Sequence, residues 1–222
     1  MSIRRRRTAH LSLNVVFGSL LAVGVAAPAT PAQAATTYSA PVLTAVRALS
    51  VAAENNDGYD RDRYFGRWRD ANSDCQDTRS KVLVQESTVT ATGGCRISNG
   101  RWLSWFDNTT HTSATTVQID HLIPVAEAWG SGAQTWTQSR RVAFYNDLGD
   151  RRALNAMASA VNRSKGARSR EEWMPPYAGA RYIAGWTAIK HRWQLAVDVA
   201  ERAALTRWAD SCPNLTITVA RP

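Results

Sequence analysis

The hydrophobic and polar positions predict one helix followed by a strand-rich stretch in the first half of the chain. Apolar residues recur at helical spacing over residues 40–55. Residues 58–74 carry many Asp, Arg and aromatic side chains without a regular period. A hairpin is expected across Asn99-Gly100, a dipeptide typical of tight turns. Short strands are predicted over residues 81–86, 88–92, 95–98, 101–106 and 115–119.

The second half of the pattern is mainly helical. A strand over residues 154–157 would complete a hairpin with residues 115–119. Thr137 or Thr135 provides an N-cap for the second of the helices, and Gly166 a stop for the third. Helices are predicted over residues 124–129, 137–148, 158–165 and 181–208, the last with room for one break. The sequence therefore predicts a single α+β domain.

The first 34 residues have the organisation of an export signal. Residues 4–7 are all arginine, residues 11–27 are mostly apolar, and Ala32-Gln33-Ala34 is a small-x-small cleavage site. We therefore expect a secreted protein whose mature chain starts near Ala35, exported by the general or the twin-arginine route. A retained membrane anchor is the weaker interpretation, because the apolar stretch is short and interrupted by Ser, Asn and Gly.

Composition narrows the class of partner only modestly. The net charge is +9 at pH 7, and loss of the export signal, which holds four arginines and no acidic residue, leaves +5. Such a charge suits a polyanionic partner and equally a basic secreted protein of another kind. All nine Trp residues follow the signal, and most of them are expected in the core.

Three cysteines also follow the signal. Cys75 and Cys95 are expected to form a disulfide, because exported proteins meet an oxidising compartment. Cys212 is then a buried, free or intermolecularly paired thiol, so a disulfide-linked dimer is one of the oligomeric states left open. A Cys-Cys-His zinc site is the alternative, but no two cysteines have a ligand spacing such as C-x-x-C.

Asp120-His121, at the end of a predicted strand, and Asn162, on a later helix, are the components of a one-metal phosphodiesterase site. Asp120 and Asn162 offer oxygen atoms to a hard divalent cation. His121 faces the other way on an extended segment and can deprotonate a water molecule at physiological pH. One cation would neutralise the phosphate and stabilise the leaving oxygen. Flanking phosphates could be held by Arg163, Lys165, Arg168 and Arg170, although a lysine at a helix C-terminus is also favoured by the helix dipole.

Longer stretches around these residues carry a family resemblance. They are residues 118–129 (QIDHLIPVAEAW), 140–148 (RRVAFYNDL), 162–166 (NRSKG) and 172–176 (EWMPP), with 59–62 (YDRD) and 75–79 (CQDTR) upstream. Together they resemble the secreted HNH endonuclease family, which shares a domain with the C-terminal part of the restriction enzyme GmrSD. The resemblance spans residues 59–193, most of the mature chain.

The resemblance implies a ββα-metal (HNH) core. In that core His121 is the general base, and Asp120 and Asn162 bind one divalent cation, Mg²⁺ with Mn²⁺ and Ca²⁺ as alternatives. It divides the chain into a signal at 1–34, an N-terminal helical segment at 35–57, a nuclease domain at 58–210 and a tail at 211–222.

Two positions depart from the family pattern. Ala153 stands where the family has Asn or Gln, and Asn155, two residues later, is a candidate replacement. Ala180, six residues before Trp186, stands where the family often has a Cys, which would leave Cys212 without a partner.

Other polar residues have both a functional and a structural interpretation. Glu127, Asn146 and Asn155 are candidate supporting groups; Glu127 could equally be a solvated helix carboxylate, and Asn146 a cap residue. Arg61 and Arg79 are candidate phosphate contacts, with pairing to nearby aspartates as the alternative.

The predicted function is metal-dependent hydrolysis of DNA, with RNA as a further candidate substrate, at low sequence specificity. Nucleic acid is the expected partner, and no stable membrane anchor is expected. The main alternative is a secreted nucleic-acid-binding protein with an inactive site, motivated by Ala153. A zinc hydrolase using the histidines and Cys212 is a third hypothesis, but the chain has no H-E-x-x-H spacing.

Overall fold

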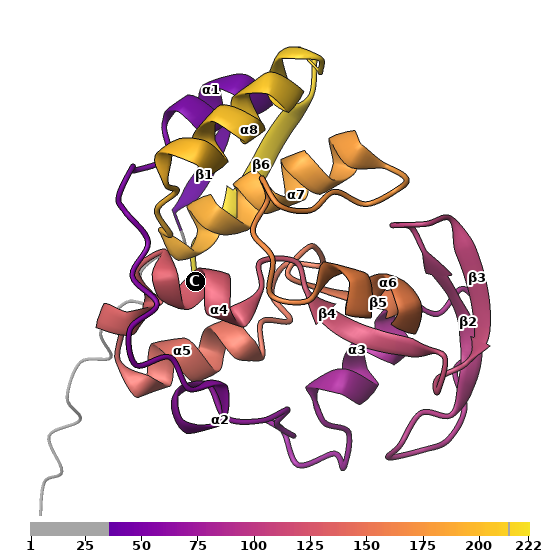
Figure 1. Cartoon of the computed structure of the whole chain (residues 1–222). Coiled ribbons are helices and arrows are strands. Elements are labelled where there is room, and N and C mark those ends of the chain that lie inside the picture. Colours follow the sequence, from indigo (N-terminus) through magenta and orange to yellow (C-terminus); the bar gives the residue numbers. More distant parts are fainter. Residues whose placement is uncertain (1–35, 213) are drawn as a thin grey trace, which may run out of the picture. The chain divides into compact units, whose positions relative to one another are not determined.

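The computed structural model describes residues 36–212 and 214–222, and the predicted export signal lies outside them. Residues 35–222 belong to one unit. In its described part, three two-stranded antiparallel sheets are combined with helices (Figure 1). The fold is therefore of mixed α/β type with small antiparallel sheets.

The elements alternate along the chain in short segments. The strands are β1 Thr37–Pro41, β2 Asn99–Ser104, β3 Thr109–Ser113, β4 Val117–His121, β5 Leu154–Ala158 and β6 Thr216–Ala220. The α-helices are α1 Val42–Arg47, α2 Arg61–Tyr64, α3 Thr78–Glu86, α4 Val125–Gly130, α5 Gln138–Tyr145, α6 Ser159–Lys165, α7 Gly179–Trp193 and α8 Val199–Asp210. A short 3-10 helix, η1, covers Ala133–Thr135.

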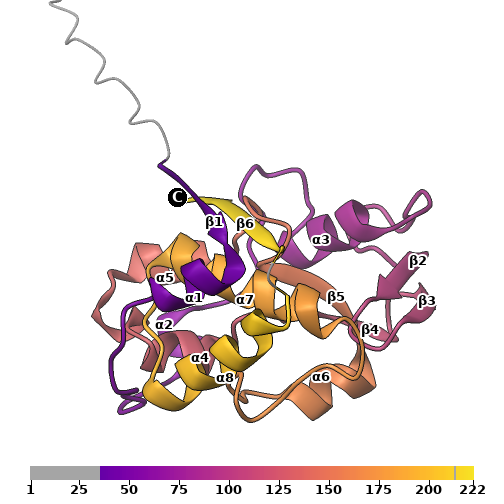
Figure 2. The same cartoon turned by 90° about the horizontal axis from the view of Figure 1, so that it is seen from above.

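The β4–β5 pair and the helix that follows it form the centre of the fold. Asp120 lies opposite Asn155, and α6 packs against both strands. The free edge of β5 is capped by side chains, since the N–H of Ala156 donates to Glu86 (2.9 Å) and that of Ala158 to Ser104 (3.1 Å). In two perpendicular views this pair lies between α4 and α5 on one side and β2–β3 on the other (Figures 1 and 2). The predicted pairing of residues 154–157 with the strand that precedes Asp120 is confirmed, and so is the helix predicted over residues 158–165.

A fully buried lysine connects three helices beside this hairpin. Lys190 Nζ, on α7, lies 2.5 Å from Glu127 of α4 and 3.0 Å from Glu201 of α8. It also donates to the Ser131 hydroxyl (2.7 Å) and the Ala196 carbonyl (2.8 Å). A buried charge is stable only when it is paired and hydrogen-bonded, so this cluster fixes the position of α4, which follows His121 in the chain.

Three predicted strands and one predicted turn are wrong: residues 95–98 form only a turn and a bend before β2 begins. Residues 81–86 belong to α3, because Asp77 caps the helix by accepting a hydrogen bond from the N–H of Ser80 (2.8 Å). Residues 88–92 contain no strand beyond an isolated bridge at Thr92. Asn99 and Gly100 lie inside β2; the chain turns at residues 105–108 instead, where Asn108 takes the left-handed φ of 56° that Asn tolerates.

The two ends of the described chain differ most from the sequence-based expectation. The predicted helix over 40–55 shrinks to α1, and β1 precedes it. The predicted tail at 211–222 contains β6, which pairs antiparallel with β1. The long helix 181–208 is broken between α7 and α8, where Gln194 has a φ of 56° and Asp198 caps the second helix. The helices predicted at 124–129 and 137–148 are confirmed as α4 and α5, with Thr137 as the N-cap of α5.

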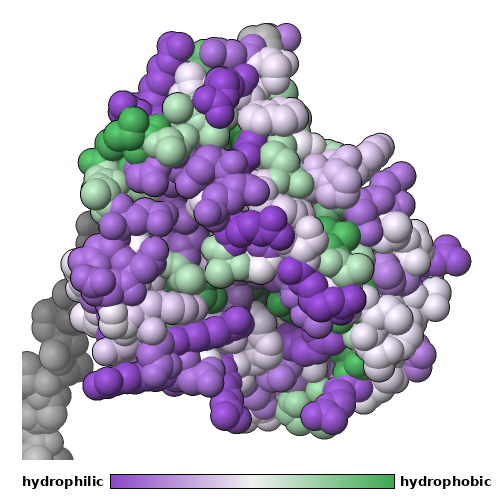
Figure 3. Space-filling view, viewed as in Figure 1, coloured by the Kyte–Doolittle hydropathy of each residue, from purple (hydrophilic) through white to green (hydrophobic). Residues whose placement is uncertain are grey.

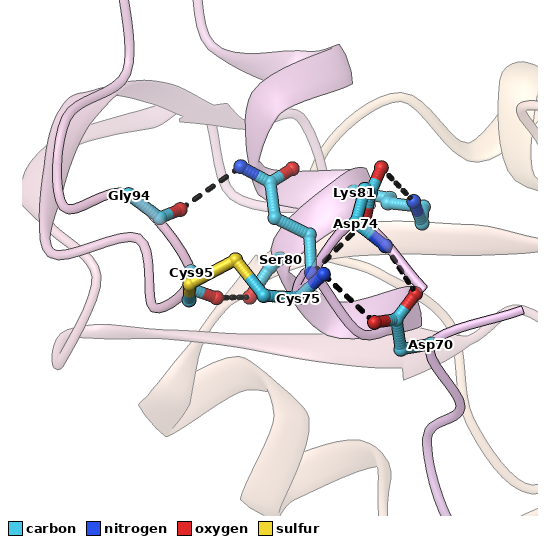
Figure 4. Close-up of a disulfide and its surroundings, with 8 residues drawn as sticks. Asp70, Asp74, Cys75, Ser80, Lys81, Gly94 and Cys95 are labelled. Atoms are coloured by element: carbon cyan, nitrogen blue, oxygen red, sulfur yellow. Dashed lines mark hydrogen bonds and ion pairs between the residues drawn. A yellow bond between two sulfur atoms is a disulfide. The ribbon is translucent and has the colours of Figure 1, made fainter. Parts of the chain in front are cut away.

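The predicted disulfide between Cys75 and Cys95 is confirmed, and it joins the loop before α3 to the loop before β2. Hydrogen bonds surround it (Figure 4): the N–H of Cys75 donates to Asp70 (2.8 Å), and the Ser80 hydroxyl donates to the Cys95 carbonyl (3.0 Å). Cys212 is half-buried and forms no disulfide within the described residues.

The surface seen in Figure 3 is mainly hydrophilic, and hydrophobic residues show on it in small separate areas. Most Trp residues lie in the core as predicted: Trp102, Trp105, Trp129, Trp173, Trp186 and Trp193 are buried, whereas Trp208 is exposed. Among the helices that the structure describes, none is long and apolar enough to cross a membrane.

Replacing Cys75 and Cys95 together by Ala should lower the free energy of unfolding by about 3 kcal/mol, because the unfolded chain gains the freedom of the opened loop. Urea denaturation of the variant and the oxidised wild-type protein measures the difference. Cys212→Ser is the control and should unfold like the wild type. An unchanged midpoint in the double variant would contradict the prediction.

Stability should fall as the pH rises from about 5 to 9. Burial, followed by interaction with Glu127, raises the pKa of Glu54 to about 8, and burial raises that of Glu201 to about 7. A carboxyl with a raised folded-state pKa holds its proton longer in the native chain, so its contribution is complete below the unfolded pKa and is lost as the pH passes the folded one.

Urea unfolding at pH 5, 7 and 9 measures this fall. Glu54→Gln should flatten it, because an amide does not titrate. Equal pH dependence in the variant and the wild-type protein would show that Glu54 does not contribute.

Candidate active site

One cavity brings the predicted site residues together. It has a volume of about 420 Å³ and is lined by residues from the end of β4, the start of α4 and the end of α6. Asp120, His121 and Asn162 all line it, as do Arg61 and Arg79. Gly166 also lines it and ends α6 with a φ of 55° and a ψ of −135°, a conformation in which a side chain would be strained.

The imidazole of His121 is held by one hydrogen bond and several aromatic rings. Its Nε2 lies 2.9 Å from the Tyr145 carbonyl oxygen, at the end of α5. The indole of Trp68 stacks on it with ring centroids 5.0 Å apart and planes 10° apart. The ring of Phe144 also lies nearly parallel to it, at 6.0 Å and 19°. Only 6% of His121 is exposed, so the ring is recessed in the cavity.

These contacts define the protonation state of His121. A carbonyl oxygen can only accept, so Nε2 carries the hydrogen and Nδ1 carries the free lone pair. No hydrogen bond joins Nδ1 to another described residue. Burial lowers the pKa of His121 to about 3, and the positive charges of Arg61 and Lys165 act in the same direction. The imidazole is therefore neutral at physiological pH, with one nitrogen able to accept a proton.

Asp120 is paired with Lys165, which is fully buried at the end of α6. The Lys165 ammonium lies 3.0 Å from Oδ1 and 2.9 Å from Oδ2, but only Oδ1 receives a hydrogen bond. The same ammonium donates to the main-chain carbonyl of His121 (2.8 Å). Burial raises the pKa of Asp120, and the Lys165 charge opposes this shift. Lys165 thus fixes the end of β4 to α6 and is not exposed to a phosphate, contrary to the role considered for it from the sequence.

The oxygen atoms of Asp120 and Asn162 suit a divalent cation. Asp120 Oδ2 receives no hydrogen bond, although the Lys165 ammonium lies 2.9 Å from it. Asn162 uses its amide nitrogen to donate to Gln118, and no described residue donates to its side-chain oxygen. Carboxylate and amide oxygens are the ligands that Mg²⁺ prefers. In the described part of the chain, no cluster of three or more His, Cys, Asp or Glu residues could hold a metal. A cation here would therefore rely on two protein oxygens together with water or substrate.

Two arginines face the cavity without an acidic partner. Arg79 donates to the carbonyls of Ala114 (2.9 Å) and Val117 (3.2 Å), and Arg61 donates to the Tyr145 hydroxyl (2.9 Å). Neither forms an ion pair with a described residue, so the alternative of pairing with the nearby aspartates is not observed. Both charges are available to an anion in the cavity. Arg163 is exposed on α6 but does not line the cavity.

Three of the predicted supporting residues lie outside the cavity. Glu127 binds Lys190 and is neither solvated nor in contact with His121. Asn155 accepts a hydrogen bond from Trp105 (3.2 Å) and donates to the Arg152 carbonyl (2.9 Å), at the turn before β5. Asn146 contacts the segment that carries Trp68. They act on the structure around the site rather than on its contents.

Several cavity residues were not identified from the sequence: Tyr59, Trp68 and Gln118. Trp68 lies in the segment 58–74, where no periodicity indicated which side chains point inward. Gln118 could have been found from strand alternation, because it shares a face of β4 with Asp120. The carbonyl of Tyr145 carries no side-chain signal at all.

Comparison with known proteins identifies a secreted fungal relative. No known family model matches the chain, and no solved structure matches it. An uncharacterized secreted protein of Arthroderma benhamiae is 36% identical over 192 residues, which cover 83% of this chain and 93% of the relative. Secretion agrees with the predicted export signal. The chain is therefore a secreted protein and belongs to the same family as this fungal protein.

Proposed function

We propose that the protein is a metal-dependent endonuclease that hydrolyses phosphodiester bonds of DNA, and also of RNA, with low sequence specificity. The observation that supports it best is the geometry of His121: an oriented imidazole with a free Nδ1, in a cavity shared with Asp120 and Asn162. The antiparallel pair β4–β5 followed by α6 has the order of elements expected of a ββα-metal core.

In this reaction His121 acts as the general base. Its Nδ1 accepts a proton from the attacking water, and the bond from Nε2 to the Tyr145 carbonyl keeps the ring oriented and stabilises the imidazolium that forms. Asp120 and Asn162 would hold the divalent cation through their side-chain oxygens. When bound, that cation supplies charge neutralisation at the phosphate and stabilises the leaving oxygen.

Arg61 and Arg79 bind the phosphate oxygens. Their guanidinium groups line the cavity and lack carboxylate partners among the described residues, so they are free to donate to a substrate anion. Contacts of this kind read the backbone and not the bases. The substrate is therefore selected as a phosphodiester polymer and not by its sequence.

One observation favours the alternative of a nucleic-acid-binding protein without activity. The Lys165 ammonium already neutralises the Asp120 carboxylate, which reduces the attraction of that carboxylate for a second cation. Such a protein would bind DNA or RNA through the same arginines but would not cut it.

His121→Ala should reduce the cleavage rate by about 10²–10⁴-fold, because water loses its base. Digestion of plasmid DNA and of RNA by residues 35–222, with Mg²⁺, Mn²⁺ or EDTA, measures the rate. The matched control is His111→Ala, since the His111 ring forms hydrogen bonds to Thr109 and Thr116, does not line the cavity and should be dispensable. A folded wild-type protein that binds DNA yet cuts nothing with any metal would favour the alternative.

Asn162→Ala should raise the Mg²⁺ concentration needed for half-maximal cleavage by at least about tenfold, since even groups that only support a metal ligand cost 10–100-fold in affinity. Titrating Mg²⁺ against the cleavage rate measures the shift. Asn99→Ala is the control, because that amide contacts only Ser98. An identical Mg²⁺ dependence of the Asn162 variant and the wild-type protein would exclude Asn162 as a ligand.

A further inference from the structure

We propose that Asn146 is a positioning residue of this site: it holds Trp68 against the imidazole of His121 and so keeps that ring in its reactive orientation. This inference rests on the proposed nuclease function. Asn146 itself does not line the cavity, so it acts through Trp68 and not on the substrate.

The side chain of Asn146 binds the backbone on both sides of Trp68. Its Oδ1 accepts from the N–H of Arg69 (3.0 Å), and its Nδ2 donates to the carbonyl of Arg67 (3.3 Å). The same amide accepts from the Thr78 hydroxyl (2.7 Å) and donates to the Val142 carbonyl (3.0 Å). Both donors and two acceptor positions are thus used. A loop of otherwise irregular backbone is thus fixed at Trp68, the residue of this loop whose ring stacks on His121.

The other contacts of His121 come from the same end of α5. Tyr145, whose carbonyl binds Nε2, directly precedes Asn146. The ring of Tyr145 lies 4.6 Å from that of Trp68. The turn that ends α5 therefore holds the imidazole edge directly and its face indirectly, through Trp68. Release of Trp68 would remove the most nearly parallel of these rings and leave the imidazole held by the Tyr145 carbonyl and by the rings of Phe144 and Tyr145.

The remainder of the loop is anchored separately. The N–H of Thr78 donates to the Arg69 carbonyl (2.9 Å), and the disulfide with its hydrogen-bonded neighbours holds residues 70–75 (Figure 4). Loss of the Asn146 amide should therefore release Trp68 locally while the loop stays attached. This separation makes the role of Asn146 testable without unfolding the domain.

Asn146→Ala and Asn146→Asp test the proposal, with two measurements on each. Oxidative footprinting read by mass spectrometry should show several-fold more modification at Trp68 in the Ala variant and unchanged modification at the buried Trp102 and Trp186.

The second measurement is the kinetics of cleavage of plasmid DNA. In the Ala variant kcat should fall roughly 10–100-fold while KM stays within about twofold, because a misplaced base affects the chemical step and not binding. The Asp variant keeps both acceptor contacts but turns an oxygen toward the carbonyls of Arg67 and Val142, so its kcat should also fall and its Trp68 modification should also rise. Asn55→Ala, which removes a comparable loop contact to the N–H of Asp57 (2.9 Å), should match the wild type.

A double-mutant cycle with Trp68→Ala completes the experiment. If Asn146 acts through Trp68, the losses in kcat of the two single variants should not add in the double variant. Additive losses, unchanged Trp68 modification or unchanged kcat in Asn146→Ala would each overturn the proposal. If the Ala variant does not fold, the Asp variant decides by the same two measurements. An inactive wild-type protein would refute the nuclease function itself, whereas an active one with unaffected Asn146 variants would refute only the positioning role.

Discussion

The packing of this domain depends on the buried ammonium of Lys190. It is the shared partner of carboxylates on two other helices, Glu127 on α4 and Glu201 on α8, and both are almost completely buried. Removing the cation would leave two negative charges in a low-dielectric interior, which costs far more than the loss of a surface ion pair. The helices can therefore meet only in the arrangement that brings all three charges together. That arrangement also fixes α4, and with it the chain that leaves the end of β4 at His121.

A second buried ion pair with a lysine occurs at the site, where Lys165 joins Asp120 to α6. The central sheet has only two strands, and a two-stranded pair has little stability of its own. Here its end is held by a buried ion pair on one face and by aromatic rings on the other, while side chains of Glu86 and Ser104 cap its edge. The end of β4 and the imidazole of His121 are thus held by side chains from several different segments.

The sequence predicted the parts of the fold that local signals determine. The strand ending at His121, the helix capped by Thr137 and the helix ended by Gly166 were predicted, because a β-branched run, a capping threonine and a glycine stop act over a few residues. The site residues Asp120, His121 and Asn162 were predicted to converge, and they line one cavity. Residues 81–86 were mistaken for a strand because the cap at Asp77 outweighs a short apolar run. Trp68, the role of Lys165 and the β1–β6 pairing could not be predicted, since each depends on contacts between segments far apart in the chain.

The pairing of β1 with β6 has a consequence for how the protein is made. Thr37 lies opposite Ala220, so the first described strand pairs with the last. Synthesis runs from the N-terminus, so β1 is made long before its partner strand. The β1–β6 sheet can therefore form only after residues 216–220 have been translated, whereas both strands of the β4–β5 pair are made much earlier.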